Sequence, residues 1–217
     1  AEAIEVAGRG EVAPVVLTAP PGDWERYEGM RVRIEAPLAI AGQHQLARRG
    51  VLHASFGGRL ATPTAVAAPG DEAARVEADN RRRSLLLDDA RADENPGRAW
   101  YLEGGAPPRL GSVAHRVEGI VDERWGERRL QLTAPLRIEP APRPQPPSVP
   151  ARVRLAVLNL QNLFNGDGRG GDFPTARGAR TPAQLRAQLA RLVATIHALD
   201  AHVAALMELE NDGYGPE

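Results

Sequence analysis

The sequence predicts an α+β protein, in which a mainly β region is followed by a linker and by one β-α-β unit. Three observations lead to this prediction. Short β-type runs separated by Gly, Pro and Asp occupy residues 21–139, closely spaced prolines occupy residues 140–150, and a long amphipathic helix lies between two apolar runs in residues 151–217. The chain has 217 residues, of which 42% are hydrophobic, so it can bury a core.

Residues 1–20 contain one short apolar stretch, Val15 to Leu17, which ends before two consecutive prolines. We expect an N-terminal strand here, or the remnant of a unit that lies upstream.

The region 21–139 consists of short runs with β character, which span Met30 to Ile40, Gly50 to Phe56, Ser84 to Leu87, Val113 to Asp122 and Trp125 to Thr133. Turn residues interrupt these runs at short intervals, so we expect a small barrel or sandwich. Residues 90–111 carry turn residues throughout and are predicted to form a long excursion between strands. Adjacent acids on a strand point to opposite faces, so Asp88 and Asp89 are expected in a turn rather than at a cation site.

Residues 140–150, PAPRPQPPSVP, are predicted to be a semi-rigid linker. Proline has no backbone N–H and holds the chain near polyproline II, so closely spaced prolines prevent both helix and sheet.

Residues 151–217 are predicted to form strand, loop, helix and strand. The helix is expected to begin at Thr181, because Pro182 follows at the first helical position and Gln184 completes a capping box, and to end at Asp200. Its apolar residues recur with a helical period, so it should pack on a sheet: Leu185, Leu189, Leu192, Val193, Ile196 and Leu199. The order strand-helix-strand implies a parallel strand pair.

Asn159 and Glu208 are expected at the same edge of this sheet, because each stands near the carboxyl end of its strand. A converging amide oxygen and carboxylate suit a hard divalent cation such as Mg²⁺, which prefers oxygen ligands and keeps waters that a substrate phosphate can replace. A single Glu at a strand end also occurs as an ordinary surface or capping group. The residues by themselves leave both interpretations open.

Two segments of this region, AVLNLQNLF at 156–164 and GDFPTARGARTPAQLRAQLARLVATIHALDAHVAALMELENDGYG at 171–215, resemble the opening of the endonuclease/exonuclease/phosphatase domain, in its extracellular nuclease branch. The resemblance implies that Asn159 belongs to the catalytic site and that Glu208 binds a divalent cation, Mg²⁺ or alternatively Mn²⁺ or Ca²⁺. It implies metal-assisted hydrolysis of phosphodiester bonds in DNA or RNA. It also implies that this region is part of an α/β sandwich, of which the β-α-β unit is an incomplete piece.

The resemblance further marks neighbours of the site, namely Gln161, Asn162, Arg177, Glu210 and Asn211. Gln188 and the Arg-Gly-Ala element at 177–179 also match the family pattern. The catalytic His, the Asp-x-Asn pair and the Ser-Asp-His motif of the family are not found up to Glu217. We therefore expect this chain by itself to be inactive and the nuclease activity to belong to a longer parent protein.

The first region carries a second part of the resemblance, in the segments ERYEGMRVRI, RRGVLHASFGGRLATPTAVAAPG and NRRRSLLLDD. These are similar to the OB-like segment that precedes the catalytic domain in such nucleases. An OB-like barrel could guide a single strand of nucleic acid through aromatic side chains, Phe56 or Trp125, and through arginines. The candidate arginines are Arg48, Arg49, Arg81, Arg82 and Arg83. Clustered arginines more often form a solvated face, so a non-enzymatic interdomain module is the alternative.

Composition limits the remaining possibilities. Arginine supplies all 27 basic residues against 28 acidic ones, and the net charge of -1 predicts no general attraction to nucleic acid, so a basic site must be local. There is no Cys, which excludes disulfides, thiolate metal sites and a cysteine nucleophile. The sequence predicts no membrane span and no signal peptide, whereas the resemblance implies a secreted or periplasmic parent protein. The uncovered β-α-β unit is a candidate homodimer contact.

Overall fold

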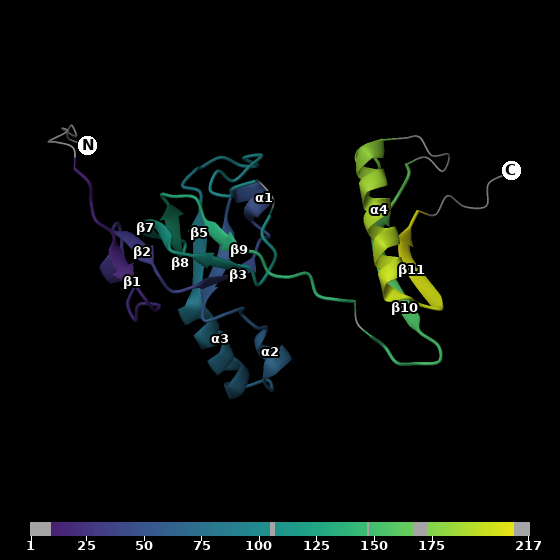
Figure 1. Cartoon of the computed structure of the whole chain (residues 1–217), viewed down its shortest axis with the longest axis horizontal. Coiled ribbons are helices and arrows are strands. Elements are labelled where there is room, and N and C mark those ends of the chain that lie inside the picture. The colour runs from purple at the N-terminus through teal and green to yellow at the C-terminus, as the bar shows by residue number, and fades with distance from the viewer. Residues whose placement is uncertain (1–9, 105–106, 147, 167–172, 211–217) are drawn as a thin grey trace. The chain divides into compact units, whose positions relative to one another are not determined.

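The computed structural model describes residues 10–104, 107–146, 148–166 and 173–210. The chain divides into two compact units, Ala1–Pro142 and Arg143–Glu217. The protein is mixed α and β but mostly β, and the strands of the first unit form one curled sheet of nine strands (Figure 1).

The sheet of the first unit contains β1 (Val15–Leu17), β2 (Arg31–Ile34), β3 (Leu38–Gly42), β4 (Leu52–Phe56), β5 (Ser84–Asp88), β6 (Val113–His115), β7 (Val117–Arg124), β8 (Glu127–Leu132) and β9 (Arg137–Glu139). The strands lie in the order β1-β2-β7-β8-β5-β4-β3-β6-β9. The pairs β1–β2 and β5–β8 are parallel and the other pairs are antiparallel.

Two of the predicted runs are each divided into two strands. The run 30–40 becomes β2 and β3, which are separated at Pro37, a residue that cannot donate to a ladder. The run 113–122 becomes β6 and β7, and Arg116 between them has a φ of 51°. The stretch Val15–Leu17 forms β1 of this same sheet and places Leu17 in the core.

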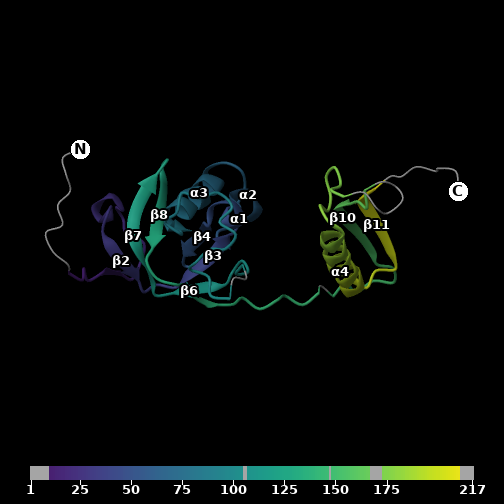
Figure 2. The same ribbon diagram turned by 90° about the horizontal axis from the view of Figure 1, so that it is seen from above.

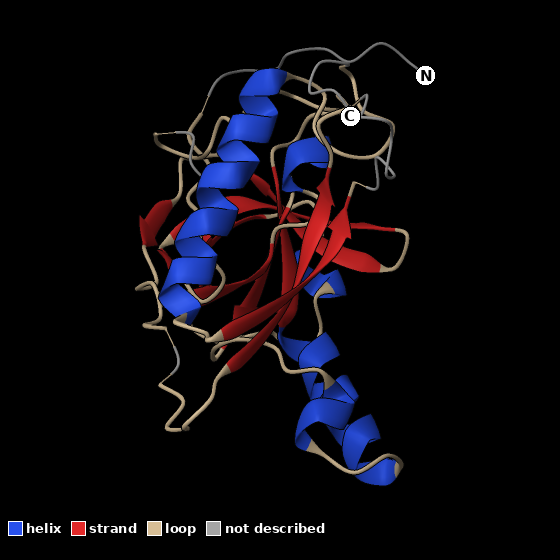
Figure 3. Ribbon diagram, turned by 90° about the vertical axis from the view of Figure 1, so that its right-hand side faces the viewer, coloured by secondary structure: helices blue, strands red, loops and turns tan. Residues whose placement is uncertain are grey.

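The helix α3 (Asp71–Arg83) was not predicted from the sequence, nor were the short α1 (Leu46–Arg49), α2 (Pro63–Val66) and the 3-10 turn η1 (Glu25–Tyr27). In α3 only Ala73 is buried, so no apolar stripe indicates it. Acids in the first turn of α3 and arginines in its last turn complement the helix dipole. This charge pattern was the signal in the sequence from which the helix could have been predicted. Both α2 and α3 project from one end of the sheet (Figures 1 and 3), and no helix of the described residues could span a bilayer.

The core of the first unit is filled mainly by side chains from the strands, together with Ala99, Tyr101 and Leu102 from the predicted excursion. Tyr101 is fully buried, and its hydroxyl donates a hydrogen bond to the Gly50 carbonyl at 2.6 Å. Next to it, Trp100 Nε1 donates to the Asp89 carbonyl at 2.8 Å. The excursion 90–111 is therefore anchored in the core, although it contains no helix or strand among its described residues.

The second unit consists of β10 (Leu155–Leu163), α4 (Pro182–Leu199) and β11 (Val203–Leu209), and the two strands pair in parallel. The predicted strand-helix-strand order and the parallel pairing are confirmed. The described residues between β9 and β10 contain no helix or strand, and the division between the units falls within the predicted linker.

The helix α4 covers one face of the β10–β11 sheet (Figure 2). Its predicted start is confirmed, because the Thr181 side chain accepts a hydrogen bond from Gln184 N, and Asp200 caps the end at a φ of 47°. The predicted apolar stripe is too wide: Leu189 and Val193 are exposed, while the other four predicted members are half-buried.

No described element of the second unit covers the opposite face of the β10–β11 sheet. Leu155, Val157 and Val203 are 72%, 68% and 55% exposed there. Strands of parallel sheets are normally buried on both faces, so this face is unusual for such a sheet.

Candidate functional site

The carboxyl edge of the β10–β11 sheet brings Asn159 and Glu208 into contact. The parallel register sets Asn159 opposite Met207, the residue before Glu208. Asn159 Nδ2 donates a hydrogen bond to Glu208 Oε1 at 2.6 Å, and Asn159 Oδ1 accepts one from Gln161 N at 2.7 Å. Two residues that are 49 positions apart in the chain are thus direct neighbours.

The backbone of this edge is irregular on both strands. Gln161, Asn162 and Glu208 have φ values of 58°, 53° and 62°, in the left-handed region that residues other than Gly rarely adopt. The register between β10 and β11 shifts between Asn159 and Leu163, as at a β-bulge. This bulge directs Asn162 N toward Glu208 Oε2, at 3.0 Å. Both carboxylate oxygens of Glu208 are therefore held by donors from β10.

Two residues outside the strands support the bulge. Gln188 of α4 donates from Nε2 to the Leu160 carbonyl at 2.8 Å and to the Gln161 carbonyl at 3.0 Å. At Gly178 a Cβ atom would lie closer to the Asn162 carbonyl oxygen than any van der Waals contact allows. Both positions match the family pattern in the sequence, but nothing in the sequence indicates that they position the bulge.

The other predicted neighbours of the site differ in their surroundings. Glu210 Oε2 accepts hydrogen bonds from Asn165 N at 2.5 Å and from Gly166 N at 3.0 Å, so this carboxylate holds the loop that follows β10. Arg177 is exposed between β10 and α4. Asn211 lies outside the described residues.

The donor set at this edge fits a magnesium ion better than a closed zinc site. The Glu208 carboxylate is a hard oxygen donor, whereas Asn159 turns its amide nitrogen toward Glu208 and its amide oxygen toward Gln161 N. Mg²⁺ commonly takes one or two carboxylates and completes its shell with waters and phosphate, whereas structural zinc takes four nitrogen or sulfur ligands. Within the described ranges, no group of three or more His, Cys, Asp or Glu residues is arranged to hold a metal ion.

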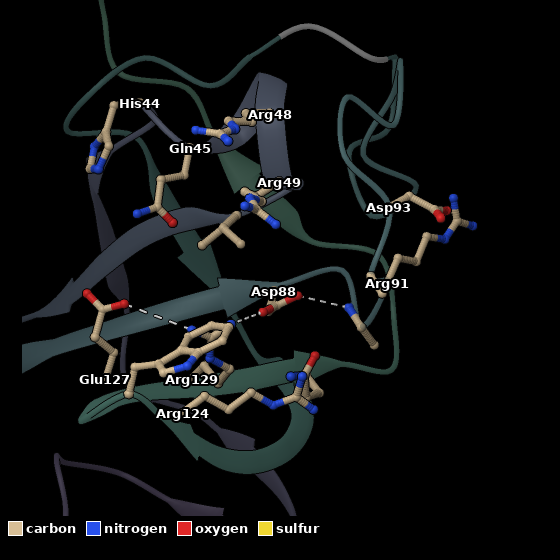
Figure 4. A pocket seen from close by; sticks show the side chains of 15 residues that line it. His44, Gln45, Arg48, Arg49, Asp88, Arg91, Asp93, Arg124, Glu127 and Arg129 are labelled. Carbon is tan, nitrogen blue, oxygen red and sulfur yellow. Dashed lines mark hydrogen bonds and ion pairs between the residues drawn. The ribbon is translucent and has the colours of Figure 1, made fainter.

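The first unit contains a separate candidate site, a cavity of about 960 Å³. Three segments line it: α1 with its flanks, the loop after β5, and the hairpin of β7 and β8. Figure 4 shows Arg48 and Arg49 above the cavity, Arg91 and Asp93 on the loop, and the hairpin residues below. Five arginines and three acids contribute to the lining. Two further acids, Glu94 and Asp122, form ion pairs with three of these arginines, so the cavity gathers arginines without a local excess of positive charge.

The predicted arginines do not form one cluster. Arg48 and Arg49 line the cavity, and both form ion pairs with Glu94. The remaining three lie at the carboxyl end of α3, outside the cavity lining, and pair with acids of that helix: Arg81, Arg82 and Arg83. Phe56 is only 3% exposed and belongs to the core, so it cannot stack on a base. Of the two predicted aromatic side chains, only Trp125 is accessible.

A buried ion pair lies at the floor of the cavity. Arg129 Nη1 donates to Asp88 Oδ2 at 2.5 Å, and both side chains are more than 90% buried. Asp88 is the last residue of β5 and not part of a turn as predicted, whereas Asp89 follows the strand. Each accepts a hydrogen bond from the amide two residues further on. Burial raises the pKa of the Asp89 carboxyl above its ordinary value, and the neighbouring Asp88 acts in the same direction.

Asp89→Asn is expected to stabilise the first unit relative to wild type more at pH 7 than at pH 4. Folding raises the pKa of the Asp89 carboxyl, so its titration stabilises the folded state at pH values below the ordinary pKa of 3.8. This stabilisation is lost as the pH rises through the pKa that the carboxyl has in the folded protein. The measurement is urea unfolding at both pH values, followed by tryptophan fluorescence. A stability difference that stays constant or reverses with pH would contradict the expectation.

Comparisons with models of protein families, with curated proteins and with solved structures returned no match to this chain.

Proposed function

We propose that the second unit is part of a metal-dependent phosphoesterase domain of the endonuclease/exonuclease/phosphatase type, which hydrolyses phosphodiester bonds of DNA or RNA. The observation that carries this proposal is the contact between Asn159 and Glu208 at the carboxyl edge of a parallel strand pair. In α/β folds this edge is where active sites form. The resemblance of the same two segments to this superfamily supports the proposal.

In this proposal Glu208 is the ligand of a divalent cation, Mg²⁺ in the first instance. A bound cation would neutralise charge on the substrate phosphate. Asn159 orients the Glu208 carboxylate through its Nδ2, and its own side chain is fixed by the hydrogen bond that Oδ1 accepts from Gln161 N. The bulge at 161–162 keeps both groups at the sheet edge, because its amide at Asn162 holds the other oxygen of Glu208.

The uncovered sheet face supports the interpretation as one layer of an α/β sandwich. Leu155 and Val157 on β10 and Val203 on β11 form an exposed apolar surface of a kind that soluble domains rarely leave uncovered. In a sandwich, this face would pack against a second layer of strands. In a parent nuclease, that layer and its loops would also supply the His and Asp residues expected from the resemblance.

For the first unit we propose an OB-like barrel. β2 and β3 are separated only by residues 35–37 and can be taken as halves of one bent strand. Pairing then runs from β2 through β7, β8, β5 and β4 and returns to β3, so five strands close a ring. An OB-fold is a five-stranded, partly open barrel, which supports this proposal.

Glu208→Gln is expected to weaken binding of Mn²⁺, used as a paramagnetic probe for Mg²⁺, by at least about tenfold, as loss of a group that ligates or orients ligands commonly does. Gln is isosteric and still accepts hydrogen bonds, but it lacks the negative charge that holds the cation. The measurement is electron paramagnetic resonance of free Mn²⁺ during titration of the full chain, with Mg²⁺ as competitor.

Asp200→Asn is the matched control for this experiment. Asp200 precedes β11, at the opposite end of the strand from Glu208, and Asn tolerates its left-handed φ of 47°. If the control loses as much Mn²⁺ affinity as Glu208→Gln, the cation is not bound at the proposed edge. If Glu208→Gln destabilises the unit without changing Mn²⁺ affinity, Glu208 is a structural cap of the bulge.

A further inference from the structure

Trp125 is the most exposed of the large apolar side chains in the described residues, at 87%. It stands between β7 and β8, where Arg124 pairs with Glu127, so Trp125 and Gly126 form a two-residue hairpin loop. The indole also contributes to the lining of the 960 Å³ cavity.

The conformation of this loop does not favour tryptophan. Trp125 and Gly126 have φ values of 56° and 74°, and a two-residue loop with two positive φ values favours Asn, Asp or Gly. A bulky residue in the left-handed region is an outlier, and here the side chain gains almost no burial in return. Residues held in unfavourable backbone regions are concentrated at ligand sites, so the fold alone does not account for Trp125.

One arginine lies beside the indole, and others line the same cavity. The guanidinium of Arg129 lies 5.5 Å from the centroid of the Trp125 ring, a cation–π distance that orients the ring. Four more arginines line the same cavity and are exposed to solvent: Arg48, Arg49, Arg91 and Arg124. Their ion-pair partners, Glu94 for the α1 arginines and Asp122 for Arg124, are exposed or half-buried. Such pairs are weak and leave the guanidinium groups able to bind another anion.

We propose that this cavity binds single-stranded nucleic acid, with Trp125 as the stacking platform for a base and the exposed arginines as phosphate-binding groups. Guanidinium groups match phosphate geometry, and an indole stacks on any base. A duplex hides the faces of its bases, so an exposed indole at the rim of a cavity favours a single strand. The cavity volume of about 960 Å³ lies at the upper end of the range of ligand pockets.

Other ligand classes use only part of this arrangement. An acidic peptide would pair with the arginines but offers no flat ring for Trp125, and a neutral oligosaccharide would stack on Trp125 but leaves the arginines without anions. The proposed ligand uses both features, so the loss of either should weaken binding.

The test is the fluorescence anisotropy of a labelled oligothymidylate titrated with the full chain. Trp125→Asn should weaken binding by about 5- to 150-fold, the range seen when one stacking aromatic is removed. It should leave the circular dichroism spectrum unchanged and should not lower the melting temperature by more than a few degrees, because Asn suits the turn. Arg48→Gln/Arg49→Gln should weaken binding and reduce the slope of log affinity against log salt by about 1.4, at about 0.7 per phosphate contact.

Arg81→Gln/Arg82→Gln is the matched control, because it removes the same charge from α3, outside the cavity lining. It should leave the affinity within about twofold, because neither arginine lines the cavity and each is paired with an acid of its own helix. Equal loss of affinity in both double variants would overturn the proposal. So would the absence of binding to the oligothymidylate, equal affinity for a duplex, or equal competition by polyglutamate or by a neutral oligosaccharide.

This proposal does not depend on the metal site of the second unit, and the two can fail separately. Glu208→Gln should leave oligothymidylate binding in the presence of EDTA unchanged, and Trp125→Asn should leave Mn²⁺ affinity unchanged. Loss of oligothymidylate binding in Glu208→Gln would mean that the strand is bound at the second unit and would overturn the proposal.

Discussion

Arg129→Met is expected to destabilise the first unit by about 3–5 kcal/mol, because it leaves the buried Asp88 carboxylate without its partner. Both side chains of this ion pair are more than 90% buried. Among the described residues, the Asp88 carboxylate would keep one hydrogen bond, from Ala90 N at 3.1 Å. Met fills a volume close to that of the Arg stem, so the loss reports the unpaired charge rather than a large cavity.

Urea unfolding followed by tryptophan fluorescence measures this loss. All three tryptophans lie in the first unit, so the signal reports that unit alone. Arg128→Met is the control, because Arg128 is the neighbouring residue on β8 and is half-buried rather than buried. A surface change of this kind should cost no more than about 0.5 kcal/mol.

The double variant Asp88→Asn/Arg129→Met separates the charge from the shape. It removes both charges and keeps an acceptor for Ala90 N, so it should recover much of the stability lost in Arg129→Met. Equal stability of the single and the double variant would mean that the pair acts through packing and not through charge.

The second unit could be predicted from the sequence almost in full because its signals are local. The start of α4 depends on Thr181 and Gln184, three residues apart, and the structure contains the capping hydrogen bond between them. The shared edge of Asn159 and Glu208 follows from strand-helix-strand connectivity alone, since crossover connections make the strands parallel. The bulge beside them could not be predicted, because it depends on Gln188 and Gly178 reaching β10 from other segments.

The first unit was predicted only at the level of class. The β character of this unit could be recognised from the sequence. The helix α3 could not be recognised from a hydrophobic pattern, because only Ala73 of it is buried and its apolar residues do not recur at helical spacing. The sequence predicts one run over residues 30–40, whereas the structure has two strands that pair with different neighbours on either side of Pro37. Pro37 was the available signal for this bend, because proline cannot donate to a strand ladder. The alternation of apolar and polar residues in Arg31–Ile34 is also absent from Leu38–Gly42.

The sequence predicts some of the residues that line the cavity but not the cavity itself. Arg48, Arg49 and Trp125 were singled out by residue type, but so were Arg81 and Phe56, which the structure places on α3 and in the core. The segments that meet at the cavity are up to 87 residues apart, as for His44 and Gln131. Tertiary pairing, and not local pattern, decides which arginines share a surface with the exposed indole.

Tyr101→Ala is expected to have an effect as large as that of Arg129→Met, although residue 101 lies in a segment with no helix or strand among its described residues. Tyr101 is fully buried, and truncation of a buried aromatic ring costs about 3–5 kcal/mol. The variant also leaves the Gly50 carbonyl without its hydrogen bond from the hydroxyl. Tyr101→Phe keeps the ring and loses only that bond, so it should cost about 1–2 kcal/mol.

Urea unfolding of the two variants, again followed by tryptophan fluorescence, tests whether the excursion is part of the folding core. Leu110→Ala is the control, because Leu110 belongs to the same segment but is 41% exposed. If Tyr101→Ala costs no more than Leu110→Ala, the excursion is a peripheral loop. If it costs several times more, the loop that carries Arg91 to the cavity is held in place by Tyr101, and the stability of the cavity wall is coupled to that of the core.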